Sequence, residues 1–162
     1  MNEDKVCQKL EQLGLVLPAP MQLPPGMVAK FPMVRIVGQR CLISGHGPLN
    51  ADGTIAQPLG KVGAEVDIEQ AVLAARLTTL AILSSLKTEL GSLDRITAWG
   101  RVMGMVNSAP GFNKQTPVID GFSNLINELF DPDVAAHSRA AVGMAELPMG
   151  IPVEIEAEVY FE

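Results

Sequence analysis

Strict alternation of apolar and polar side chains over the last ten residues of the chain predicts a β-strand. The apolar positions are Val153, Ile155, Ala157, Val159 and Phe161, and the positions between them are Glu154, Glu156, Glu158, Tyr160 and Glu162. A period of two places these two sets on opposite faces of a strand. A proline-bracketed turn, residues 147–152, precedes it, and a strand-like run begins at Arg139. We therefore predict a terminal hairpin, with Arg139 and the row of carboxylates on adjacent strands.

Helical spacing of apolar residues predicts three helices, over residues 3–13, 67–90 and 118–130. Asp67-x-x-Gln70 matches the capping-box pattern at the start of the second helix, and Gly91 stands where that helix must end. The proline-rich segment 15–31 cannot be regular structure, and we interpret it as an extended arm.

The remaining patterns predict strands that complete one sheet. Residues 31–44 indicate two short strands around a turn at 37–40, and residues 96–106 indicate a further strand. After the N-terminal helix, the order ββ-α-β-α-ββ is typical of an α+β fold in which two helices pack on one face of a sheet. The other face carries the acidic row, so we expect identical subunits to cover it. We divide the chain into an N-terminal helix and arm, residues 1–29, and a single domain, residues 30–162.

Composition limits the classes of function. The chain has 162 residues, of which 48% are hydrophobic and 19% charged, and a net charge of −6. Phosphate binding needs clustered Lys and Arg, so this charge argues against a nucleic-acid partner. Two cysteines, Cys7 and Cys41, are too few for a disulfide framework, and Cys41 is expected in the core. We find no signal peptide and no stretch near the roughly 20 apolar residues of a membrane span, so we expect a cytoplasmic protein without a membrane partner.

Candidate chemistry begins with Arg139, which is followed by the small residues Ala140 and Ala141. A guanidinium with room around it can bind a carboxylate, although a surface ion pair is the common alternative. The glutamates of the final strand repel one another, which raises the pKa of any buried member and would suit that carboxyl group to proton transfer. The alternative interpretation is that the row is simply a solvent-exposed face.

A second candidate is the segment Ser44-Gly45-His46-Gly47, where glycines would let a ligand approach the backbone, although the local sequence favours a simple turn. His46 could act as a base, but neither it nor His137 has a role fixed by the sequence. No ligand spacing indicates a metal and no motif indicates an organic cofactor, so we expect neither.

Two motifs carry a family resemblance. Arg139 is followed by AELP and then VEIEA, and Ile43-Ser44-Gly45 follows a Val-Gly turn. Residues 30–162 resemble the RidA family, also called YjgF/YER057c or endoribonuclease L-PSP, and the N-terminal extension resembles its longer-chain subgroup. The resemblance implies a chorismate-mutase-like fold with a mixed sheet, assembled as a homotrimer with clefts between subunits.

The resemblance also implies an activity that needs no cofactor. Deaminases of this family hydrolyse reactive enamines and imines, such as 2-aminoacrylate and 2-imino acids, to 2-keto acids and ammonia. Arg139 would then bind the carboxylate of the small-molecule substrate, and Glu154 would position or activate the hydrolytic water. Ser44 and Gly45 would line the cleft and face Arg139 across a subunit boundary.

Several cleft positions depart from the family pattern. Phe31 stands where tyrosine is frequent, Ala141 where cysteine is frequent, Ser123 at the place of an asparagine, and His46 in place of a glutamine. These departures keep Arg139, the residue expected to bind the substrate carboxylate, but remove other polar groups from the cleft. Two alternatives therefore stay open, namely a non-catalytic trimer that binds small carboxylates and an endoribonuclease.

Overall fold

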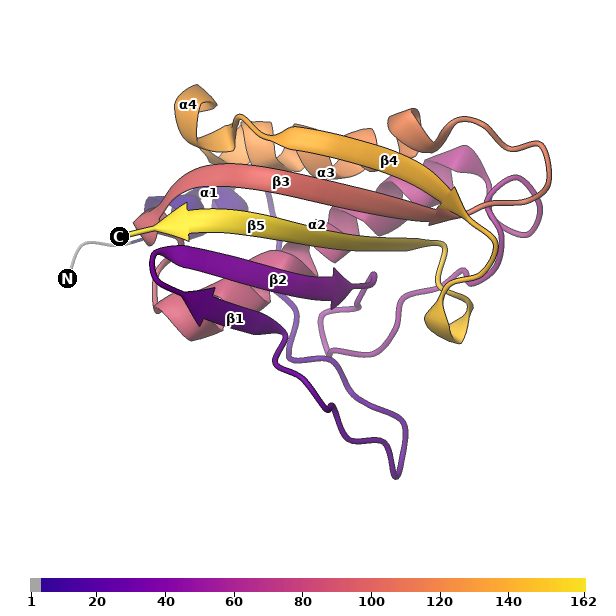
Figure 1. Ribbon diagram of the computed structural model, residues 1–162, viewed down its shortest axis with the longest axis horizontal. Helices are drawn as coiled ribbons and strands as arrows, with labels where there is room; N and C mark the ends of the chain where they lie inside the picture. The colour runs from indigo at the N-terminus through magenta and orange to yellow at the C-terminus, as the bar shows by residue number, and fades with distance from the viewer. Residues whose placement is uncertain (1–3) are drawn as a thin grey trace.

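A five-stranded mixed sheet forms the framework of the computed structural model, which describes residues 4–162 (Figure 1). Its strands are β1 Val34–Val37, β2 Arg40–His46, β3 Ile96–Asn107, β4 Ser138–Met144 and β5 Val153–Phe161. The spatial order is β1-β2-β5-β3-β4, and β3 and β4 are parallel, whereas the other neighbouring strands are antiparallel. The predicted two-residue turn between the first two strands is confirmed, because Val37 pairs with Arg40.

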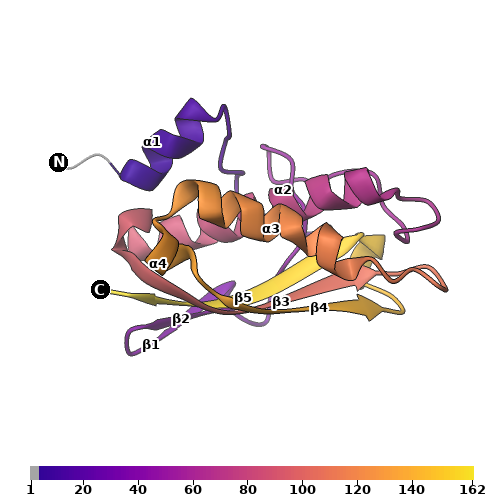
Figure 2. The same cartoon turned by 90° about the horizontal axis from the view of Figure 1, so that it is seen from above.

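The helices lie on one face of this sheet, as predicted (Figure 2). They are α1 Lys5–Gln12, α2 Ile68–Leu90, α3 Gln115–Leu129 and the short α4 Pro132–Ala135, with 3₁₀ turns at Leu93–Arg95 and Pro148–Gly150. The main differences from the prediction are that α3 begins three residues earlier than residue 118 and that α4 was not predicted. Residue 3, the start of the first predicted helix, lies outside the described residues, and Asp4 caps α1 by accepting from the Cys7 N–H.

The predicted terminal hairpin is wrong. β4 and β5 are not neighbours, because β3 lies between them: Val102 of β3 pairs with Arg139 on one side and with Ala157 on the other. Alternation along a strand indicates which face a side chain takes, but it carries no information about which strand hydrogen-bonds to which. The long strand β3 hydrogen-bonds to β4 along one edge and to β5 along the other. One whole strand therefore separates Arg139 from the row of carboxylates.

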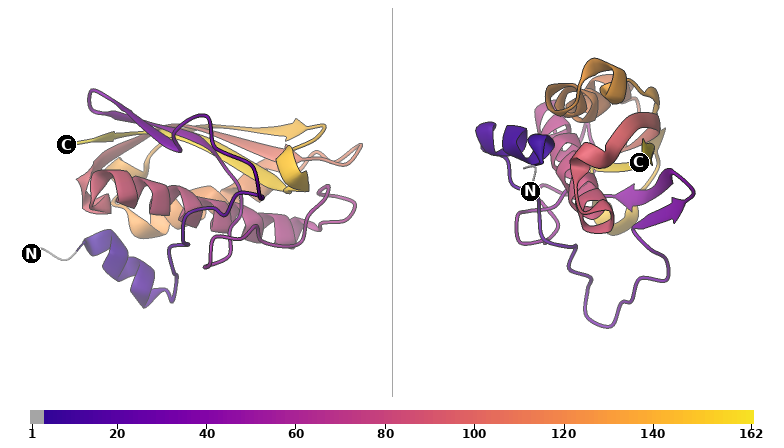
Figure 3. Two further views of the ribbon diagram at one scale, coloured as in Figure 1. Left: turned by 90° about the horizontal axis from the view of Figure 1, so that it is seen from below. Right: turned by 90° about the vertical axis from the view of Figure 1, so that its left-hand side faces the viewer.

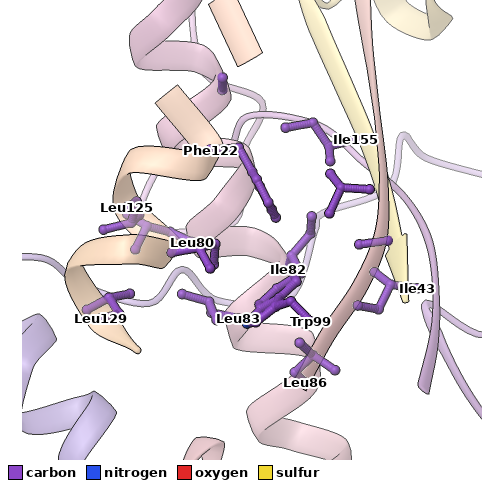
Figure 4. Close-up of a cluster of buried hydrophobic side chains, with 14 of the residues drawn as sticks. Ile43, Leu80, Ile82, Leu83, Leu86, Trp99, Phe122, Leu125, Leu129 and Ile155 are labelled. Carbon is purple, nitrogen blue, oxygen red and sulfur yellow. The ribbon is translucent and has the colours of Figure 1, made fainter. Parts of the chain in front are cut away.

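The core lies between the sheet and the helices α2 and α3 (Figure 4). The predicted capping box starts α2, with the Asp67 side chain accepting from the Gln70 N–H and Gln70 accepting from the Asp67 N–H, and Gly91 ends it with a positive φ of 80°. Ile82 and Leu86 of this helix are fully buried, as Cys41 is in β2. Burial of each large aliphatic side chain stabilises the fold by about 1.5–3 kcal/mol.

The composition of α2 corrects one expectation from the sequence. Among the described residues, this helix of 23 residues, with a mean hydropathy of 1.3, is long and apolar enough to cross a membrane by those two measures alone. In the fold, 56% of its apolar window is buried. The apolar side chains of α2 therefore pack against the sheet and α3, as those of a core helix do.

The opposite face of the sheet is covered by no helix among residues 4–162 (Figures 2 and 3). This face carries Leu42, Met103 and Val142. Along each strand these residues alternate with the residues that face the helices. Arg40 and Glu158 form a bidentate ion pair on the same face, at 2.8 and 2.7 Å. Cover by identical subunits, which we expect for this face, stays a prediction.

The N-terminal segment packs onto the helical side. α1 places Val6 and Leu10 in the same core as the sheet, so the division of the chain at residue 29 also stays a prediction. The arm has no regular structure, as predicted, and loops away beyond the β1 edge of the sheet (Figures 1 and 3).

Candidate functional site

A β-bulge in β2 shapes the first part of the site. Ile43 pairs with Ala157 and His46 pairs with Ile155, so three steps along β2 correspond to two along β5. The extra residue turns both Ile43 and His46 into the core and leaves Ser44 and Gly45 in the bulge between them. Bulges commonly redirect side chains at functional sites, and this one brings the Gly45 backbone beneath a carboxylate.

That carboxylate belongs to Glu154. A Cβ atom built on Gly45 would lie 1.9 Å from Glu154 Oε1, so the absence of a side chain at Gly45 is what lets the carboxylate lie there. Glu154 is half-buried, and burial, followed by the charge of Glu156, raises the pKa of its carboxyl group. It has no hydrogen-bond or ion-pair partner among the described residues. The other members of the row differ: Glu158 is paired with Arg40, which lowers its pKa, and Glu156 is exposed.

An open apolar cavity of about 290 Å³ lies beside Glu154. Gly45 and Glu154 line it, together with arm residues that include Phe31 and residues of the 3₁₀ turn that include Met149. Phe31, predicted as a cleft residue, is therefore brought next to Glu154. Met149 has a φ of 58°, in the left-handed region that a non-glycine residue seldom adopts, so its conformation is strained.

Ser44, predicted to line a cleft between subunits, holds the chain before β1 in place within the single chain, and its role in a cleft stays a prediction. Its hydroxyl donates to the Pro32 carbonyl at 2.9 Å and its N–H donates to the Met33 carbonyl at 2.9 Å, so it fastens the end of the arm. It lines a neighbouring hollow with Phe31 and not the cavity beside Glu154.

His46 is a core residue. Its Nδ1 lies 2.6 Å from the Ser44 carbonyl oxygen and its Nε2 lies 2.9 Å from Ser85 Oγ. Burial lowers the pKa of this imidazole. A neutral ring held by two partners inside the fold fits a structural role, which argues against His46 as the base.

Arg139 forms the second part of the site, at the far edge of the sheet. Its Nη1 donates to Ser123 Oγ at 2.8 Å and lies 3.0 Å from Asp120 Oδ1, so the guanidinium reaches from β4 onto α3. The fold thus brings together Arg139 and Ser123, which were both predicted to bind substrate, and that role stays a prediction. Ala141, two residues further on the same face of β4, packs against the core, next to Gly104 in register.

Two members of this second part, Asp120 and His137, were not predicted. Ser123 Oγ lies 2.8 Å from His137 Nε2, and His137 Nδ1 lies 2.7 Å from the Ala135 carbonyl oxygen. If Nδ1 donates to that carbonyl, Nε2 accepts from the Ser123 hydroxyl, whose oxygen accepts from Arg139. Asp120 and Ser123 are three residues apart on a predicted helix, and that spacing is the signal from which a shared face could have been inferred.

The two parts do not meet within one chain. Arg139 pairs with the buried Val102 and so faces the helices, whereas Glu154 pairs with Met105 on the uncovered face. Two strand spacings and three residues along the strands place their Cα atoms roughly 14 Å apart. A site that uses both side chains on one small ligand therefore needs a second copy of the chain.

A metal is not indicated by the arrangement of donors. Among residues 4–162, no group of three or more His, Cys, Asp or Glu side chains is arranged to hold a metal ion.

Comparison with known proteins places the chain in a family. No family model matches the sequence. Protein TCP17 of Trypanosoma cruzi is 34% identical over 160 residues, covering 96% of this chain and 93% of that protein. A candidate endoribonuclease from Shewanella oneidensis MR-1 is 25% identical, with a TM-score of 0.88 and coverage of 97% of this chain and 99% of the other. The chain belongs to the RidA (YjgF, endoribonuclease L-PSP) family.

Other solved structures extend the comparison. Atu1372 of Agrobacterium tumefaciens, a protein of unknown function, is 37% identical with a TM-score of 0.88, covering 98% of this chain and 94% of that one. TdcF of E. coli, solved with bound serine, is 18% identical with a TM-score of 0.57, covering 89% and 99%, and shows that the RidA fold is shared. The predicted fold class is thus confirmed.

Proposed function

We propose that this protein is a RidA-type deaminase that hydrolyses 2-aminoacrylate or related 2-imino acids to 2-keto acids and ammonia. The observation that carries the proposal is the Glu154 carboxyl group, half-buried, without a partner and held over Gly45 at the edge of an apolar cavity. A carboxyl group with a raised pKa in a cavity is typical of a group that transfers protons.

The chemistry needs one such group. 2-Aminoacrylate first becomes the imine, as its nitrogen loses a proton and C3 gains one. Water then adds to C2 of the imine, and Glu154 carries the proton that the water loses to the nitrogen. As the carbinolamine breaks down, Glu154 carries the hydroxyl proton to the nitrogen, so that the C2=O double bond forms and ammonia leaves. The C2–O bond forms, the C2–N bond breaks, and one water is consumed for each ammonia released. Because an imine is already electrophilic, positioning and proton transfer suffice, and no cofactor enters the scheme.

Arg139 would hold the substrate carboxylate from a neighbouring subunit, which makes the homotrimer part of the proposal. The separation of Arg139 from Glu154 within one chain and the uncovered face of the sheet both support such an assembly. The guanidinium is mostly covered, with 17% of its side chain exposed, whereas its partner Asp120 is 48% exposed. A ligand carboxylate could therefore replace the Asp120 contact at small cost. TdcF binds an amino acid on the same fold, which supports a small carboxylate ligand.

A non-catalytic trimer that binds small carboxylates is the second candidate. The observation that favours it is the Asp120 ion pair, which competes for Arg139 in the unliganded protein. An endoribonuclease has less support, because the net charge of −6 opposes binding of a polyanion.

The test uses 2-aminoacrylate generated by a lyase, with release of ammonia and pyruvate followed over time. We expect wild type to accelerate the release, and Glu154→Gln and Arg139→Ala to lower the enzymatic rate by about 100-fold or more. The matched control is Glu162→Gln, an exposed carboxylate of the same row that does not act on the pKa of Glu154, and it should retain activity within about twofold. Keto-acid binding without acceleration would favour the non-catalytic trimer, and light scattering should give three times the 17.2 kDa subunit mass.

A further inference from the structure

The cavity beside Glu154 is built almost entirely of apolar groups. One wall comes from arm residues 21–33, including Met27, Val28 and Phe31. The opposite side includes Leu49 and Ile151, which are themselves buried. Among its lining residues only Glu154 and Lys30 carry charged side chains. The polar edge at Glu154 and the apolar remainder give the cavity two chemically different ends.

The wall formed by the arm is held in place at both ends. At the near end Gln22 N donates to the Gly53 carbonyl at 2.9 Å, and at the far end Ser44 Oγ donates to the Pro32 carbonyl at 2.9 Å. Gly53 allows this close passage, because a Cβ there would lie 2.3 Å from the Pro20 carbonyl oxygen. The cavity is therefore formed before any ligand enters, as is usual for small-molecule sites.

The volume is large for the substrate with which the family is associated. An apolar cavity of about 150 Å³ is enough to hold benzene. The cavity of about 290 Å³ thus has room for a branched aliphatic or aromatic side chain. The methylene group of 2-aminoacrylate would leave most of the apolar wall without a contact.

We propose that this cavity is the side-chain subsite of the deaminase site, and that the preferred substrates are 2-imino acids with a branched aliphatic or aromatic side chain. The inference rests on the proposed function for the reaction, but the subsite can be tested through binding alone. The cavity is continuous with the candidate catalytic group, because Gly45 and Glu154 line it. This continuity supports a substrate side chain as the group that fills the cavity.

The test is calorimetric binding of stable 2-keto acids, the products of the proposed reaction. With each buried carbon group worth about fourfold in affinity, the three additional carbons of 4-methyl-2-oxopentanoate should make it bind roughly 10- to 60-fold more tightly than pyruvate, the upper figure corresponding to complete burial. Val28→Trp, which fills the cavity from its rim, should reduce this preference to less than about threefold. The control is Val16→Trp, since Val16 is 65% exposed and Val28 69%, but only Val28 lines the cavity. The control should keep the wild-type preference.

The outcomes separate the subsite from the reaction. The expected ranking without hydrolysis of any imine would support the subsite and reject the deaminase. Hydrolysis of 2-aminoacrylate with equal affinity for all the keto acids would overturn the subsite and leave the deaminase standing. A wild-type preference that Val28→Trp does not change would place the side chain elsewhere and also overturn it. No keto-acid binding, as expected if a second subunit fills the cavity, would overturn it as well.

Discussion

Gly45→Ala should lower the enzymatic rate by about 100-fold while leaving the fold intact. The added methyl carbon would lie 1.9 Å from Glu154 Oε1, 2.9 Å from Cδ and 3.2 Å from Cγ. Gly45 is not among the glycines with positive φ, so alanine can adopt its backbone conformation. The conflict is therefore confined to the carboxylate of Glu154, which must move.

The size of the effect follows from these distances. Carbon and oxygen atoms without a bond come no closer than roughly 3.2 Å, so Oε1 must shift by about 1.3 Å or more. The end of a glutamate side chain can turn at low cost, and we expect the free energy of unfolding to change by less than about 1 kcal/mol. A displacement of about 1 Å in a catalytic group costs on the order of 100-fold in rate. Glu154 would also become more exposed, which should move its pKa back toward the ordinary carboxyl value, since burial is the main cause of the shift.

The assay is a double-mutant cycle of Gly45→Ala and Glu154→Gln, with imine hydrolysis and thermal unfolding measured for all four proteins. If the alanine acts through Glu154, it should lower kcat/KM by about 100-fold in wild type and by less than about threefold in the Glu154→Gln background. Two results would show the idea to be mistaken. One is an equal loss in both backgrounds, and the other is a large fall in Tm, which would mean that the bulge itself has been disturbed.

Two further substitutions test the electrostatics of the two parts of the site. Burial raises the pKa of Glu154, so the folded protein favours the protonated carboxyl group. The protonated carboxyl group contributes its full stability to the fold below the unfolded-state pKa. This contribution is lost as pH rises through the folded-state pKa. Glu154→Gln should therefore raise Tm relative to wild type at pH 7 but not at pH 3, and a larger gain at pH 3 would contradict the sign. Asp120→Asn should remove the charge that competes for Arg139, whose Nη1 lies 3.0 Å from Asp120 Oδ1, and should tighten keto-acid binding by about two- to fivefold in calorimetry. Weaker binding would instead mean that Asp120 positions the guanidinium for its ligand.

Much of the fold was predictable because local patterns decide it. Alternation along residues 153–161 identifies the buried and exposed faces of β5, and the capping box at Asp67 and Gly91 set the limits of α2. The family motifs correctly indicated the fold class. The start of α3 was less predictable, because no side-chain cap marks it.

The sequence named candidate site residues, whose roles stay predictions, but it did not show their arrangement. The row of glutamates looks uniform in the sequence. Only in the folded chain does Glu158 meet Arg40, while Glu154 loses water beside Gly45. The pairing of Arg139 with Asp120 and the wall that the arm builds around the cavity both depend on contacts between distant segments.

Spacing along the chain thus determines which residues share a face, because the periods of strands and helices are local properties of the backbone. The tertiary structure decides which strands are neighbours, since the backbone hydrogen-bonding groups of one strand can pair with those of several other strands. Here β3 lies between β4 and β5, so Arg139 and Glu154, which the sequence places fifteen residues apart across one turn, lie on opposite faces of the sheet. That arrangement rules out the predicted hairpin site within one chain, so a site that uses both side chains on one ligand needs a second copy of the chain.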